Sequence, residues 1–169
     1  QIHSHLDAAL ATALSELLEM RSREGLAILE FLRRELEIIK NSELEIRILA
    51  PKINQRLRER IQRRVGDVLK ESKLEVDETR LVQELAFYAD RSDVTEELDR
   101  LGSHVQQFLD LLSHKKTFVI GKQLDFIVQE MLREANTIGS KADDINVTNL
   151  VVQLKLAIDR MREQVQNLE

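Results

Sequence analysis

The sequence predicts an all-α fold, an elongated helical bundle with long coiled-coil-like helices. The 169 residues include only one Pro and five Gly, whereas Leu, Glu, Arg and Gln, which favour helices, are abundant. Apolar residues also recur at intervals of three and four over most of the chain, as they do along one face of a helix. The length suits one domain, so we expect residues 1–169 to form a single helical region.

The first part of the chain predicts two long helical runs. Between Leu6 and Met20, one face of a helix carries Leu6, Leu10, Leu14 and Leu17. A second run starts near Ser22 and continues past Pro51, which makes residues 22–70 a long helical arm. Because an interior proline removes a hydrogen bond and clashes with the preceding turn, we expect Pro51 to kink or interrupt this arm. A helix this long needs an antiparallel partner or another subunit to cover its apolar stripe.

We expect residues 77–169 to form the compact part of the bundle. A short helical stretch, "ETRLVQELAFYADR", precedes "DVTE" at Asp93, whose capping-box arrangement predicts a helix start. The apolar positions that follow alternate by four and three: Val94, Leu98, Leu101, Val105, Phe108 and Leu112. We expect "SHKKTFVIGKQ" to be a loop, followed by a helix that ends near Gly139 and a last helix from about Ile145 onward.

Charge and composition exclude several classes of protein. Lys and Arg number 25 against 30 Asp and Glu, so the net charge of -5 does not attract nucleic acid or an anionic membrane, and a polyanion site must be local. The absence of Cys excludes a disulfide scaffold, a thiolate metal site and a Cys nucleophile, and fits a reducing compartment. No apolar run approaches the roughly 20 residues of a membrane span, so we expect a soluble, cytoplasmic protein. The chain starts without Met, as a piece of a longer protein would.

Two polar clusters flank the expected buried face of "LDFIVQEMLREANTIGSK". One contains Asp125, Gln129, Arg133 and Asn136, and the other contains Glu130, Glu134 and Lys141. Glu130 and Glu134 are one turn apart, so their carboxylates repel unless a cation, a metal ion or a shared proton relieves them. Either Arg133 or Lys141 could do so through an ordinary surface ion pair, and the sequence leaves this alternative open.

A second polar stripe precedes these clusters in the chain. Its residues, at spacings of four, three and four, are Asp93, Glu97, Arg100 and His104. Carboxylates one turn from a guanidinium commonly form modest ion pairs on a solvated face. His104 differs, because its pKa lies near neutrality and it could move protons, although a structural role for it also remains open.

The segment "KINQRLRERIQRR", residues 52–64, is locally basic. Six basic residues against one acid give it a local charge of +5 in a chain that is acidic overall. This segment is the best candidate for binding a phosphate backbone. The alternative is a solvated helix whose arginines pair with acids on neighbouring helices.

Four stretches of the sequence carry a family resemblance. "QIHSHLDAALATALSELLEMRSREG", "DVTEELDRLGSH", "LDFIVQEMLREANTIGSK" and "MREQVQNLE" closely resemble the C-terminal portion of the YicC-like family of bacterial proteins, which includes the YloC branch. The resemblance covers essentially the whole chain and is weakest between Leu26 and Leu74. The usual family form has Asn or a similar polar residue where Leu132 stands, but helical spacing places Leu132 away from both polar clusters.

The resemblance implies a bacterial cytoplasmic endoribonuclease, linked to stress response and RNA turnover, that needs a divalent metal ion. It also implies a ring-like hexamer around RNA and an additional N-terminal domain outside this chain. The words "EELDRLGSH" and "LDFIVQEMLREANTIGSK" cover the two polar stripes: Glu97, Arg100 and His104 in the first, and Glu130, Arg133, Glu134, Asn136 and Lys141 in the second.

We therefore expect the two helices to pack antiparallel and to bring their polar stripes together. Glu97, Glu130 and Glu134 would hold Mg²⁺ or Mn²⁺, and His104 and Arg100 would complete the catalytic set. The expected RNA-binding residues are Arg133, Asn136 and Lys141, with Arg56, Arg60, Arg63 and Arg64. Two alternatives stay open: a non-catalytic oligomerisation module that holds RNA, and a coiled-coil adaptor for a protein partner.

Overall fold

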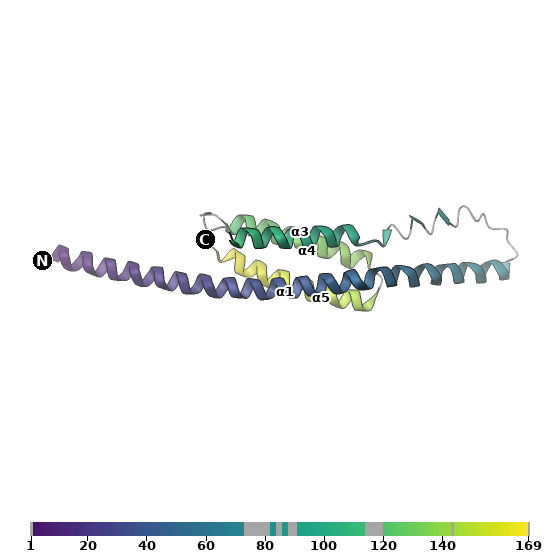
Figure 1. Cartoon of the computed structure of the whole chain (residues 1–169), viewed down its shortest axis with the longest axis horizontal. Helices are drawn as coiled ribbons and strands as arrows, with labels where there is room; N and C mark the ends of the chain where they lie inside the picture. The colour runs from purple at the N-terminus through teal and green to yellow at the C-terminus, as the bar shows by residue number, and fades with distance from the viewer. Residues whose placement is uncertain are drawn as a thin grey trace.

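The computed structural model describes residues 2–72, 82–83, 86–87, 91–113, 120–142 and 144–168. Over these ranges it contains no strand, and its helices are α1 (Ile2–Ser72), α3 (Thr95–Ser113), α4 (Gly121–Lys141) and α5 (Ile145–Gln166). Figure 1 shows them lying side by side along one long axis. The predicted all-α, elongated helical bundle is confirmed.

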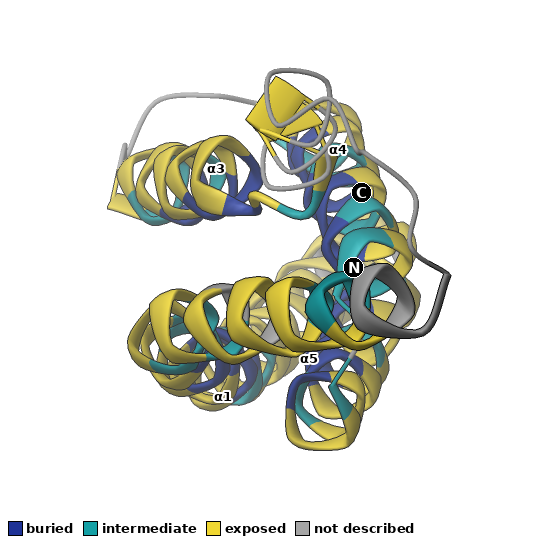
Figure 2. Cartoon of the chain, turned by 90° about the vertical axis from the view of Figure 1, so that its right-hand side faces the viewer, coloured by how far each residue is buried: buried dark blue, intermediate teal, exposed yellow. Residues whose placement is uncertain are grey.

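The helices form a ring around one core (Figure 2). α1 packs against α3 and α5, and α4 packs against the same two helices on the other side of the ring. α3 and α4 are antiparallel, because Glu97 near the start of α3 contacts Lys141 at the end of α4. Most of the apolar positions predicted along α3, α4 and α5 are buried, among them Leu98, Leu101, Val128, Met131, Leu154 and Ile158, whereas the predicted stripe at the start of α1 is exposed: Leu6, Leu10, Leu14 and Leu17.

α1 is one continuous helix of 71 residues, about 105 Å long at 1.5 Å per residue. It is much longer than its partners, so both of its ends extend beyond the bundle (Figure 1). The helix boundary predicted near Ser22 is wrong, and Pro51 does not interrupt the helix. Pro51 removes only the hydrogen bond to the carbonyl group of Arg47, while Ile46 is buried and Ile53 packs against the core, so the bundle holds the turns on both sides.

The shorter helices begin close to the predicted positions. The Oδ1 atom of Asp93 accepts hydrogen bonds from the backbone N–H (2.9 Å) and the hydroxyl group (2.6 Å) of Thr95. Asp144 likewise accepts from two backbone N–H groups in the first turn of α5. α4 continues two residues beyond Gly139. A Cβ atom at Gly139 would lie 3.1 Å from the Cγ1 atom of Val151, so this glycine allows α4 and α5 to approach closely.

Ion pairs cross the contacts between neighbouring helices of the ring. They are Glu35–Arg160 (2.8 Å) between α1 and α5, Asp125–Arg162 (3.6 Å) between α4 and α5, Glu97–Lys141 (2.9 Å) between α3 and α4, and Arg47–Asp99 (2.8 Å) between α1 and α3. Each pair forms in only one axial alignment of its two helices. Together they favour this register over slipped alternatives.

Two predicted elements fall mainly outside the described residues. They are the helix over "ETRLVQELAFYADR" and the loop over "SHKKTFVIGKQ". The loop prediction is wrong for residues 121–123, which form the first turn of α4. Among the helices that are described, none is long and apolar enough to cross a membrane.

Candidate metal centre in the α3–α4 groove

The polar stripes of α3 and α4 face each other along a groove. The α3 side carries Glu97, His104, Gln107 and Leu111, and the α4 side carries Lys141, Glu134, Glu130, Ile127 and Gln123. Spacings of three and four put each set on one face of its helix. Because α3 and α4 run antiparallel, the start of one stripe meets the end of the other.

His104, Glu130 and Glu134 converge in the middle of this groove. One ring nitrogen of His104 and one carboxylate oxygen from each glutamate all lie within 4.8 Å of one another. The side chain of Glu134 is only 2% exposed, and that of Glu130 is 23% exposed. The Nδ1 atom of His104 is buried without a hydrogen-bond partner. We call these three residues the groove cluster.

Arg133 lies against both carboxylates of the groove cluster. Its Nη2 atom is 3.0 Å from Oε2 of Glu130 and 3.0 Å from Oε1 of Glu134. The hydrogen bond to Glu134, with the charge of Glu130, raises the pKa of Arg133. The predicted ion pair with Arg133 is therefore present, but one guanidinium balances only one of two carboxylates. The groove cluster keeps an attraction for a further cation.

Glu97 is held at one end of the groove by Lys141. The Nζ atom of Lys141 donates to Oε1 of Glu97 at 2.9 Å and to the backbone carbonyl oxygen of Asp93 at 2.9 Å. Glu97 is seven residues from His104, about 10 Å along the axis of α3. The structure therefore groups His104, instead of Glu97, with the two glutamates of α4.

Arg100 and Asn136 lie outside the groove cluster. Arg100 pairs with Glu96 on its own helix. Asn136 is exposed and lies two residues from Glu134, which places it on nearly the opposite side of α4. The structure does not bring Arg100 to the glutamates.

The basic residues of α1 lie where this helix extends beyond the bundle. Arg56, Arg60, Arg63 and Arg64 are exposed, and with Asp67 they line a hollow of about 450 Å³. Arg63 lies 3.7 Å from Glu59 of the same helix. Exposed pairs of this kind contribute little stability, so a phosphate group can compete for the guanidinium.

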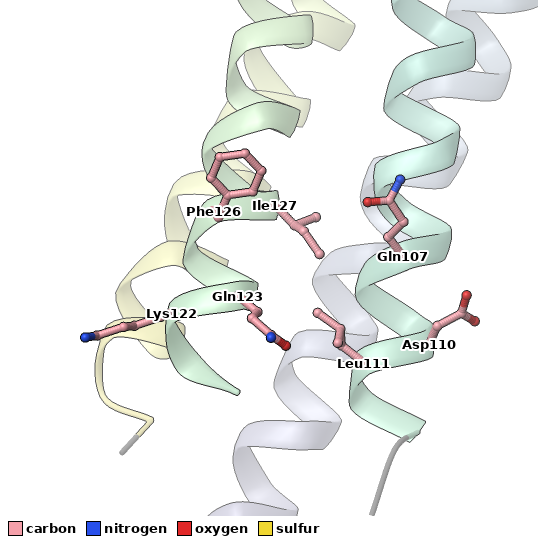
Figure 3. A pocket seen from close by; sticks show the side chains of 7 residues that line it. All are labelled: Gln107, Asp110, Leu111, Lys122, Gln123, Phe126 and Ile127. Carbon is pink, nitrogen blue, oxygen red and sulfur yellow. The ribbon is translucent and has the colours of Figure 1, made fainter. Parts of the chain in front are cut away.

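A pocket of about 730 Å³ lies between α3 and α4, toward the end of α3. Its lining comes from the last turns of α3 and the first turns of α4: Gln107, Asp110, Leu111, Lys122, Gln123, Phe126 and Ile127. Figure 3 shows Leu111 of α3 pointing toward Gln123 and Ile127 of α4, while Gln107 extends along α3. A search of the sequence for titratable groups misses these four residues, but their spacing continues the stripes of the groove cluster.

The groove cluster fits a divalent cation. Two carboxylates and an imidazole suit Mn²⁺ better than Mg²⁺, which strongly prefers oxygen ligands. The unpartnered Nδ1 of His104 offers a ligand atom without the loss of a hydrogen bond. Metal–ligand distances of about 2 Å put neighbouring ligand atoms about 3 Å from one another, so the three side chains would have to move closer together to share one ion.

Comparison with known proteins identifies the family. A family profile described as endoribonuclease YicC-like, C-terminal, matches residues 46–169. The chain is 42% identical over 166 residues to a protein named probable endoribonuclease YicC from Clostridioides difficile (strain 630), which covers 98% of this chain and 56% of that protein. It is 38% identical over 168 residues to the protein of the same name from Haemophilus influenzae (strain ATCC 51907 / DSM 11121 / KW20 / Rd). This match covers 99% of this chain and 56% of that protein.

The chain thus spans about half the length of the curated relatives that it matches. The matched range of the profile includes all of α3, α4 and α5, and with them the groove cluster. The chain belongs to the endoribonuclease YicC-like family, of which residues 46–169 match the C-terminal part.

Proposed function

We propose that the protein containing this chain is a bacterial endoribonuclease that cuts RNA phosphodiester bonds at the α3–α4 groove. One observation carries the proposal. His104, Glu130 and Glu134 place potential ligand atoms within 4.8 Å of one another, in a chain whose relatives are named probable endoribonucleases. The link to stress response, RNA turnover and the bacterial cytoplasm rests on the family resemblance alone.

The groove cluster would hold Mn²⁺ or Mg²⁺. A bound ion of this kind lowers the pKa of a water molecule and polarises a phosphoryl oxygen. Arg133 can bind the phosphate oxygens of RNA, because its side chain is 61% exposed and a guanidinium matches a phosphate group bidentately. The carboxylate oxygen of Glu130 or Glu134 that does not bind the ion would take the proton from the attacking hydroxyl group as its oxygen bonds to phosphorus; the P–O bond to the leaving oxygen breaks, and water supplies a proton to that oxygen.

The exposed arginines of α1 would hold the RNA away from the groove cluster. They are concentrated in one segment of a chain whose net charge is -5. Phosphate contacts from Arg56, Arg60, Arg63 and Arg64 would supply affinity that does not depend on the base sequence. Arg133 would extend these contacts to the groove, whereas Lys141, also predicted to bind RNA, is already bound to Glu97 and to the backbone of Asp93.

The N-terminal part of α1 supports assembly into a hexamer. Leu6, Leu10, Leu14 and Leu17 are 66%, 60%, 51% and 45% exposed. They share a helix face with Ile39 and Ile46, which are buried in the bundle. A neighbouring subunit would cover this stripe. Light scattering after size exclusion tests this: Leu10→Glu should reduce the mass of the particle, whereas Ser15→Glu, on another face of α1, should not.

A second function is a non-catalytic module that assembles and holds RNA. Arg133 already pairs with both carboxylates of the groove cluster, and such buried polar contacts can fix the register of helices without doing chemistry. In this case the catalytic groups would belong to another part of the full-length protein.

Cleavage of a labelled, structured RNA separates the two functions. The full-length protein and this chain are each incubated with Mn²⁺ or with EDTA. The proposal predicts cleavage by the full-length protein in Mn²⁺ and none in EDTA. Cleavage by this chain would place the catalytic groups within residues 1–169. Equal cleavage in Mn²⁺ and in EDTA would contradict the metal centre.

A further inference from the structure

The pocket beside the groove cluster has the size and the lining of a binding site. Its volume of about 730 Å³ lies within the range of small-molecule sites. Leu111 and Ile127 supply an apolar interior between the two helices, and Figure 3 shows Gln123 pointing toward Leu111 while Gln107 extends along α3 at the other side of the same space. An apolar slot with two amide groups suits a flat ligand whose edge both donates and accepts hydrogen bonds.

The pocket and the groove cluster occupy neighbouring turns of the same two helices. Gln107 follows His104 by three residues on α3, and Ile127 precedes Glu130 by three residues on α4. One helical turn, about 5 Å, therefore separates the pocket from the groove cluster along the groove. A nucleotide whose phosphate lies at the groove cluster would have its base, or that of its neighbour, within reach of the pocket.

We infer that the pocket bounded by Gln107, Gln123 and Phe126 binds one unpaired nucleobase of the RNA and thereby positions the strand for cleavage. This inference rests on the proposed function and adds a subsite to it.

Three features of the pocket match a nucleobase. Phe126 lies at its rim with 64% of its surface exposed, so its ring is available to stack against a base. Gln107 donates to the hydroxyl oxygen of Ser103 at 3.2 Å, but an amide group has a second donor hydrogen and an acceptor oxygen that can bond a base edge. Lys122 extends from the rim on the α4 side, where it can meet a backbone phosphate (Figure 3).

Binding of RNA without cleavage tests the pocket directly. The full-length protein is titrated in EDTA against a short labelled single-stranded RNA and against the matched duplex, and fluorescence anisotropy gives each affinity. Phe126→Ala should weaken single-strand binding by about 5- to 100-fold, as loss of one stacked base does, and should leave duplex binding unchanged. Val152→Ala removes an exposed apolar side chain from α5 and is the matched control; it should change neither affinity.

A second variant tests recognition of the base edge. Gln123→Leu keeps the size of the side chain but removes its hydrogen-bonding groups, so it should change the ratio of affinities for adenine-rich and uracil-rich RNA. Wild-type single-strand affinity in both Phe126→Ala and Gln123→Leu would overturn the inference. A Phe126→Ala variant that changes only the oligomeric state would also overturn it, because the pocket would then hold a side chain of another subunit.

These measurements distinguish a failure of the pocket from a failure of the proposed function. If the full-length protein does not cut RNA but Phe126→Ala still loses single-strand affinity in EDTA, the pocket stands and the catalytic proposal fails. If the protein cuts RNA in Mn²⁺ and both Phe126→Ala and Gln123→Leu bind single strands normally, only the pocket fails. Mn²⁺ binding, measured by calorimetry, should be equal in wild type and Phe126→Ala.

Discussion

The Nζ atom of Lys141 lies 2.9 Å from Oε1 of Glu97, and this contact joins the end of α4 to the start of α3. The side chain of Glu97 is only 7% exposed, so its carboxylate depends on this cation. The contact also fixes the axial alignment of the two helices. In this alignment His104 meets Glu130 and Glu134 further along the groove.

Lys141→Met should destabilise the bundle, because it leaves the buried carboxylate of Glu97 without its cation. We expect the free energy of unfolding to fall by about 1–3 kcal/mol in urea denaturation. Addition of Glu97→Gln should recover part of the loss. Lys40→Met removes an exposed ion pair with Glu37 and is the control, with an expected change below about 0.5 kcal/mol. Equal effects of the two lysine substitutions would contradict a structural role for Lys141.

Loss of a ligand from the groove cluster should abolish tight binding of Mn²⁺. His104→Ala and Glu134→Gln are each expected to lower the affinity by at least about 100-fold in a calorimetric titration, since they remove ligands instead of supporting groups. Glu97→Gln should retain Mn²⁺ binding, because Glu97 pairs with Lys141. Glu163→Gln, an exposed position on α5, controls for the change in charge. Loss of binding in Glu97→Gln and not in His104→Ala would reverse the assignment of ligands.

The carboxylate of Asp93 at the start of α3 should make the stability of the fold depend on pH. Hydrogen bonds from the hydroxyl group and the backbone N–H of Thr95 lower the pKa of Asp93, and the charge of Lys141 adds to the effect. A lowered pKa in the folded state means that the carboxylate stabilises the fold above its ordinary pKa. This contribution is lost as the pH falls through the lowered value.

Asp93→Ala should therefore lower the free energy of unfolding by about 1 kcal/mol at neutral pH, as loss of a helix cap does. The difference from wild type should narrow as the pH falls below about 4. Urea denaturation over a pH series measures it. Asp159→Ala, at an exposed position within α5, should change stability by less than about 0.5 kcal/mol at every pH. A difference that widens in acid would show that the carboxylate of Asp93 does not cap α3.

The basic face of α1 should contribute salt-dependent affinity for RNA. A double variant, Arg56→Gln with Arg63→Gln, should bind single-stranded RNA more weakly. The slope of log affinity against log salt concentration should become shallower by about 1.4, because each lost phosphate contact contributes about 0.7. Arg21→Gln with Arg23→Gln removes the same charge from the other end of α1. An equal reduction in both double variants would indicate general electrostatics and not a binding face.

Helical spacing predicts which residues of each helix are buried. Val128 and Met131 of α4 are fully buried, as are Leu98 and Leu101 of α3, because residues three and four apart necessarily share a face. The continuity of α1 could not be predicted in the same way. Pro51 weakens a helix locally, but cooperative hydrogen bonding and the packing of the neighbouring turns outweigh the loss of one bond.

The polar stripes could be predicted, but their alignment could not. The apolar pattern repeats about every seven residues, so a slip of one repeat between α3 and α4 would keep the same faces buried. Glu97 and His104 are seven residues apart. Such a slip would therefore place Glu97, instead of His104, opposite the glutamates of α4. The pair of Glu97 with Lys141 selects one of the two alignments, and it is visible only once the helices are placed together.

Cleavage by a variant of the full-length protein tests the central claim most directly. Glu130→Gln is compared with Glu163→Gln on a labelled RNA in Mn²⁺, with particle mass and RNA affinity measured on the same samples. If the groove cluster performs the reaction, Glu130→Gln loses at least about 100-fold in rate while mass and affinity stay at the level of the control. Cleavage by Glu130→Gln at the rate of Glu163→Gln would contradict the account and place the reaction elsewhere in the protein.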